Sequence, residues 1–154
     1  MSQSLSKLYV HIIFHIQWNG TPIQPEHANE LYAYMGSVIG SHQCLPIQIG
    51  GMADHVHVLC TLSKNVALAK LVEDVKRHGS RWIKGKSPYY RNFAWQGGYS
   101  AFSVSASVVD KTRSYIRNQP AHHRKRSYQE ELTLFLEEYD IRYEEKYLFE
   151  GGEG

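Results

Sequence analysis

Residues 50–60 read Gly-Gly-Met-Ala-Asp-His-Val-His-Val-Leu-Cys, a glycine turn followed by a short apolar strand. His55 and His57 are two positions apart, so on a strand both side chains project from the same face. The apolar side chains between them point the opposite way, as packing on a core requires. Two neutral imidazoles in this arrangement can hold a divalent metal through their ring nitrogens. The pattern equally allows two histidines that merely share a half-exposed strand face.

The segments around this strand predict the order β-α-β-β-α-β. We expect strands at 7–18, 45–49 and 54–62 and two short pieces at 93–96 and 99–105, with helices after Pro25 and after a cap at 63–65. Residues 7–18 alternate strictly, and their polar face carries His11 and His15, either of which could lie near the histidine pair. The order is that of an α+β, ferredoxin-like (split βαβ) fold, an antiparallel sheet with helices on one face. His55 and His57 would then lie on the uncovered face.

Two additional C-terminal helices are expected, at 107–119 and 127–140. Ser107 is a suitable N-cap for the first, and Pro120 ends it. Ser127 and Glu130 form a capping-box pattern for the second. We expect one domain over residues 1–154, with the sheet and its two helices in 7–105.

Length and composition fit one soluble globular domain of 154 residues, with 42% hydrophobic and 21% charged side chains. Cys44 and Cys60 form no C-x-x-C pair, which fits a reducing compartment and argues against a disulfide framework. We expect no signal peptide, no membrane association and a cytoplasmic location.

Charge is distributed very unevenly along the chain. Residues 71–126 carry twelve basic and three acidic side chains, whereas 127–154 carry two basic and nine acidic. A basic segment that also contains tyrosines and tryptophans suits a nucleic acid. The alternative is a solvated face whose charge is offset by the acidic tail. If DNA binds here, the candidate contacts are Lys76, Arg77, Arg81, Lys84, Lys86, Arg91 and Arg124.

Tyr115 and Gln119 are four residues apart and so share a face of the helix predicted at 107–119. An amide oxygen such as that of Gln119 is a fair ligand for Mg²⁺ or Mn²⁺. The phenol of Tyr115 could act as a nucleophile if its anion were stabilised. Spacing alone leaves an ordinary half-buried helix tyrosine as the simpler interpretation.

Several motifs resemble those of the single-tyrosine HUH transposases of small insertion sequences, which are related to the repeat-associated tyrosine transposases. Residues 50–59 resemble the His-hydrophobic-His motif of that family, and residues 115–119, Tyr-Ile-Arg-Asn-Gln, resemble its tyrosine motif. Residues 95–105, 122–124 and 9–11 are also similar to sequences of the family. The resemblance extends from about residue 8 to 147.

The resemblance implies a metal-dependent enzyme that cuts and rejoins single-stranded DNA beside hairpins. His55, His57 and Gln119 would hold Mg²⁺ or Mn²⁺, and Tyr115 would form a 5′-phosphotyrosine intermediate. It also implies a homodimer and no nucleotide cofactor. Two alternatives are a non-catalytic ferredoxin-like nucleic-acid-binding module and a metal-dependent phosphodiester hydrolase that works through a bound water.

Overall fold

The computed structural model describes residues 2–123 and 126–149. Its centre is a four-stranded antiparallel sheet in the order β2-β3-β1-β4. The strands are β1 (Tyr9–His15), β2 (Pro46–Met52), β3 (His55–Thr61) and β4 (Ser100–Val104). Both central strands, β1 and β3, thus lie next to each other, and the predicted α+β, ferredoxin-like arrangement is confirmed.

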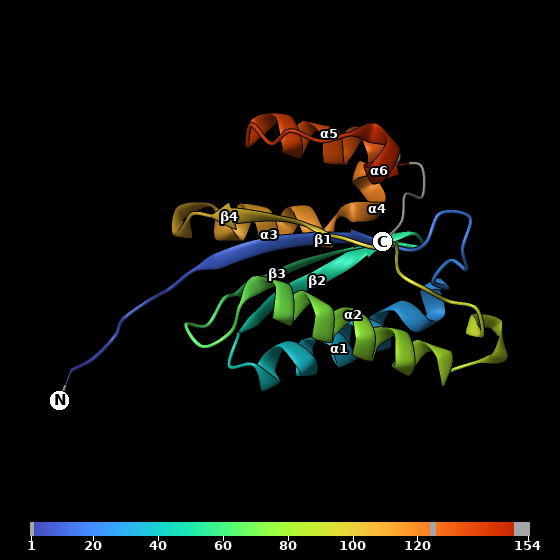
Figure 1. The fold of residues 1–154 in the computed structure, drawn as a ribbon, viewed down its shortest axis with the longest axis horizontal. Coiled ribbons are helices and arrows are strands. Elements are labelled where there is room, and N and C mark those ends of the chain that lie inside the picture. The colour runs from blue at the N-terminus through green and yellow to red at the C-terminus, as the bar shows by residue number, and fades with distance from the viewer. Residues whose placement is uncertain (1, 124–125, 150–154) are drawn as a thin grey trace.

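One face of the sheet packs on helices α1 (Pro25–Ser41) and α2 (Leu68–Lys84), which lie together below it in Figure 1. The main core forms between them from the even-numbered side chains of β1 and β3 and the apolar stripes of the two helices. Its members include Ile12, Phe14, Val58, Leu31 and Leu71. Alternation along the strands therefore turns the odd-numbered side chains toward the opposite face.

The opposite face is covered as well, which corrects the expectation of an exposed sheet surface. Helices α3 (Val109–Arg117), α4 (Gln119–His122) and α5 (Tyr128–Glu138) lie above it (Figure 1). A second apolar cluster joins Ile13 and Phe102 of the sheet to Leu132 and Leu136 of α5. Both faces of β1 are consequently buried, and His11 of the supposed polar face is only 2% exposed. A short last helix, α6 (Glu145–Phe149), follows.

The strand boundaries differ from the sequence-based ones at several points. Gly50 and Gly51 lie inside β2, and the turn into β3 is made by Ala53 and Asp54. β1 is shorter than 7–18 because an isolated bridge between Ile16 and Trp95 replaces regular pairing beyond His15. That bridge is also all that the structure shows of the strand expected at 93–96.

The helix caps agree only in part with those predicted from the sequence. Ser127 Oγ accepts a hydrogen bond from the Glu130 backbone N–H at 3.2 Å, which confirms the predicted capping box of α5. Ser107 does not cap α3, because it lies in a 3₁₀ turn, η2 (Ala106–Val108). Likewise α2 starts after Ala67 rather than after 63–65. A second 3₁₀ turn, η1 (Pro88–Tyr90), lies between α2 and β4.

Over the two described ranges, the structure contains no helix with the length and apolar character needed to cross a lipid bilayer.

Candidate active site

Strand β3 places the two histidines of the His-x-His motif side by side beneath the upper helices. Both side chains are fully buried, at 0% exposure. In the register with β1, His57 lies opposite Ile13 and His55 opposite His15. Central strands are held by hydrogen bonds on both sides, so the two imidazoles project from a stiff base.

The tyrosine motif reaches the histidines because α3 docks closely on the edge strand. Ile116 is buried against Gly50, where a Cβ atom would lie 2.8 Å from the Ile116 carbonyl oxygen. The bare glycine backbone therefore sets how near α3 can come. Helix α3 ends before Asn118, and Gln119 opens α4. Despite this break in the expected continuous helix, Gln119 is fully buried, and its Oε1 lies 3.1 Å from His55 Nε2.

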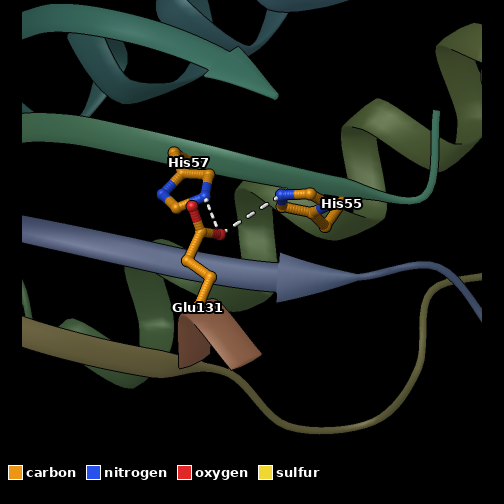
Figure 2. Close-up of side chains that lie close together, drawn as sticks. All are labelled: His55, His57 and Glu131. Carbon is orange, nitrogen blue, oxygen red and sulfur yellow. Dashed lines mark hydrogen bonds and ion pairs between the residues drawn. The ribbon is translucent and has the colours of Figure 1, made fainter. Parts of the chain in front are cut away.

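A carboxylate from α5, that of Glu131, contacts both histidines (Figure 2) and also reaches the tyrosine motif. Its Oε1 lies 2.9 Å from His57 Nε2 and 3.5 Å from His55 Nε2. Its Oε2 accepts hydrogen bonds from the Tyr115 hydroxyl and, at 3.0 Å, from Gln119 Nε2. Glu131 is 3% exposed, so one buried carboxylate contacts every residue that the sequence analysis placed in the site.

Each histidine of the pair is also held through its second ring nitrogen. Asp54 Oδ1 lies 2.7 Å from His55 Nδ1, and His11 Nε2 lies 2.7 Å from His57 Nδ1. In the neutral tautomer whose Nδ1–H donates to Asp54, His55 Nε2 keeps a lone pair directed at the centre of the site. The same holds for His57 in the tautomer whose Nδ1–H donates to His11. Such outer contacts fix the orientation of histidines that bind metals.

Burial and charge pairing change the pKa values of these groups in opposite directions. Burial alone would lower the pKa of His55, but its contacts with Asp54 and Glu131 outweigh burial and raise it to about 9. Burial lowers the pKa of His57 and, together with neighbouring His57, lowers that of His11 to about 3. Burial would raise the pKa of Glu131, yet hydrogen bonds with His55 and His57 hold it well below its usual range. Burial and the Glu131 charge raise the pKa of the Tyr115 phenol.

The nitrogen and oxygen atoms of these side chains suit a divalent cation as ligands. Within the described residues, one ligand atom from each of His55, His57 and Glu131 lies within 4.8 Å of the other two. The Gln119 Oε1 atom lies on the same side, against His55. Two imidazoles, a carboxylate and an amide oxygen form a mixed nitrogen and oxygen set that Mn²⁺, Mg²⁺ and other divalent ions accept. A cation there would also balance the buried negative charge of Glu131.

Comparison with known proteins places the chain in a family. The sequence profile of the family described as "Transposase IS200 like" matches residues 4–119, from the N-terminal segment to the glutamine of the site. The chain belongs to the IS200-like transposase family. None of the curated proteins compared with it gave a significant match.

Two solved structures show the same fold as this transposase. A candidate transposase from Deinococcus radiodurans is 20% identical, with a TM-score of 0.59 over 77% of this chain and 98% of the other. A REP-associated tyrosine transposase bound to a REP hairpin is 13% identical, with a TM-score of 0.55 over 80% of this chain and 74% of the other. At these identities the likeness concerns the fold alone.

Sequence reasoning missed that Glu131 joins this candidate site, although a signal was present. Position 131 lies three residues after Tyr128 and four before Phe135, so a carboxylate falls in the apolar stripe of α5. A charged side chain on such a stripe is buried only with partners. Asp54 directly precedes the histidine motif, but only the structure shows that it turns back onto His55. His123 was also missed as a site residue, and its Nε2 lies 3.0 Å from Gln119 Oε1.

The basic residues proposed as DNA contacts lie away from this site. Most of them belong to α2 or to the loop after it, on the side of the sheet opposite the histidines. Several make contacts inside the chain: Lys76 donates to the Gln96 and Gly98 carbonyls, Arg77 to Asp74, and Lys86 to Glu30. Arg81, Lys84 and Arg91 are exposed. Arg124 lies outside the described residues.

Proposed function

We propose that this single-domain transposase cuts and rejoins single-stranded DNA beside hairpins, with Tyr115 as the nucleophile. One observation carries the proposal: the Tyr115 hydroxyl contacts the same buried carboxylate that joins the two histidines of the His-x-His motif. The family membership supports DNA transposition. The hairpin bound by the REP-associated structural neighbour supports hairpin DNA as the class of substrate.

In this mechanism the Tyr115 oxygen attacks the scissile phosphorus, and the bond from phosphorus to the 3′ oxygen breaks. The 5′ end stays on the enzyme as a phosphotyrosine, and the 3′ oxygen leaves as a hydroxyl. Glu131 Oε2 is the acceptor that the phenol already contacts, so it is the first receiver of the Tyr115 proton. A 3′-hydroxyl of a second strand reverses the step and joins the strands, so no nucleotide is hydrolysed.

We assign His55, His57, Gln119 and Glu131 as the residues that hold Mg²⁺ or Mn²⁺. When bound, such an ion draws charge onto the phosphoryl oxygens and so helps a weak nucleophile attack. The raised pKa of Tyr115 explains why help is needed, because the phenol is neutral at physiological pH. Asp54 and His11 keep the two imidazoles oriented toward the centre of the site.

The test is incubation of the protein with labelled, hairpin-bearing single-stranded DNA and Mn²⁺, followed by a denaturing gel. We expect a covalent protein–DNA band that Tyr115→Phe abolishes, since the ring remains but the attacking oxygen is gone. Tyr89→Phe is the matched control, because Tyr89 is exposed in η1 on the α2 side, and it should keep the band. Cleavage without a trapped adduct would favour the hydrolase, and binding without cleavage under any metal would favour the non-catalytic module.

We also propose that the exposed cations at the end of α2 and in the loop after it bind the hairpin rather than the scissile strand. Reversing the charges of Lys84, Lys86 and Arg91 together should weaken binding and flatten its dependence on salt, because fewer counterions are released. Mn²⁺ binding measured by calorimetry should stay unchanged, since these residues lie across the sheet from the histidines. Unchanged DNA affinity would place the hairpin on another surface. The homodimer implied by the family resemblance is tested by light scattering.

A further inference from the structure

A half-open cavity of about 260 Å³ lies beside Tyr115, between α3 and α5. Its inner end is formed by the rings of Tyr115, His11 and Phe135, whose centroids lie 5.2 to 6.5 Å apart. Tyr139 forms part of the outer wall, and its hydroxyl donates to the Ser103 carbonyl at 2.7 Å, which fixes the ring in place. No residue of the chemistry proposed above other than Tyr115 and His11 lines this space.

We propose that this cavity receives one nucleobase of the strand that Tyr115 cuts, next to the scissile phosphate; this inference rests on the proposed function. Aromatic walls stack on the flat face of a base, and such contacts are common where proteins hold single-stranded DNA. The volume lies just below the range of roughly 300–1,000 Å³ typical of sites for drug-sized ligands. The space therefore suits a single base.

The rim of the cavity carries the charges that a nucleotide requires. Lys111 lies four residues before Tyr115 on α3, hence on the same face of that helix. It is exposed, and no ion pair involves it among the residues that the structure describes. An ammonium group in this position can contact the phosphate next to the one that is attacked. A bound base would thus be flanked by Tyr115 on one side and Lys111 on the other.

Glu138, also at the rim, gives the cavity a preference among bases. A carboxylate only accepts hydrogen bonds, so it favours bases with an exocyclic amino group, as when it accepts from N4 of cytosine. Thymine has no exocyclic amino group, and its one ring donor, N3–H, lies between two carbonyl oxygens that repel a carboxylate. We therefore expect cytosine, adenine or guanine to bind better than thymine at this one position.

The test uses Tyr115→Phe, which binds the strand without consuming it, and oligonucleotides with the fluorescent base 2-aminopurine moved along the strand beside the hairpin. We expect strong quenching at one position adjacent to the cleaved phosphate. Thymine at that position should weaken binding roughly tenfold relative to cytosine. Glu138→Gln should remove most of this difference, because an amide also donates. Glu137→Gln, one residue away and outside the cavity, should leave it intact.

Equal quenching at all positions, or the same base preference in Glu138→Gln and Glu137→Gln, would overturn the inference. The proposed chemistry would still be supported if the wild type forms its covalent adduct. Conversely, position-specific quenching that Glu138→Gln alters supports the cavity even if no adduct forms with any metal. The binding experiment and the adduct experiment can therefore contradict their two proposals independently of each other.

Discussion

At the scale of single residues, the site depends on how one buried carboxylate is shared. Glu131 uses one oxygen for the histidines and the other for Tyr115 and Gln119. Glu131→Gln keeps the shape of this side chain but takes away the proposed anionic ligand. We expect Glu131→Gln to weaken Mn²⁺ binding by one to two orders of magnitude, measured by calorimetry. Glu137→Gln on the exposed side of α5 is the control, and equal affinity in both variants would exclude Glu131 as a ligand.

Asp54 offers a second test of the same site, because it contacts His55 without reaching the tyrosine. Asp54→Asn keeps the shape of the side chain but removes the charge that orients His55 Nδ1–H. Loss of such an outer partner typically costs about 10–100-fold in metal affinity, which calorimetry with Mn²⁺ would detect. Asp110→Asn, in the exposed first turn of α3, should bind as the wild type does. Wild-type affinity in Asp54→Asn would mean that the strand alone orients His55.

At the scale of elements, the approach of α3 to β2 brings the tyrosine to the histidines. A methyl group at Gly50 would collide with the Ile116 backbone and push α3 outward. We expect Gly50→Ala to cost about 1–3 kcal/mol of unfolding free energy and to weaken Mn²⁺ binding. Gly40→Ala, in α1 with nothing within 4 Å, should be neutral or stabilise by up to about 1 kcal/mol. Urea unfolding and calorimetry measure both effects, and a neutral Gly50→Ala would show that α3 adjusts freely.

Contacts between elements also explain which features could be predicted from the sequence and which could not. The alternation along residues 7–18 and the helical spacing before and after β3 both reflect local burial. They therefore predicted the strands and helices and their order along the chain. The prediction that His55 and His57 lie on the same face of a strand follows from its two-residue period alone. The covered second face could not be predicted, because α5 reaches it through contacts between residues more than 70 positions apart, such as His57 and Glu131. The break at Asn118 was missed since Pro120 marks a helix end only approximately.

At the scale of the whole molecule, the sheet lies between two helical layers with different tasks. The lower layer closes the main core, whereas the upper layer carries the tyrosine and the carboxylate onto the histidines (Figure 1). A long apolar face such as that of residues 7–18 could by itself indicate a surface for a second copy of the chain. Within one chain that face is already covered by α1 and α2. The homodimer therefore remains a prediction that rests on the family resemblance.

Whether the site assembles within one chain can be tested more directly than the oligomeric state. His57, Tyr115, Gln119 and Glu131 of the same chain are in contact, so each chain should hold a complete site. We expect a mixture of His57→Ala and Tyr115→Phe chains to form no covalent DNA adduct, because neither chain has both the metal ligand and the nucleophile. If a dimer exchanged its tyrosine helices, mixed dimers would regain one intact site, and the adduct would reappear on the denaturing gel. Mixing each variant with wild-type chains is the control, since adduct from the wild-type sites shows that the added variant does not itself block the reaction.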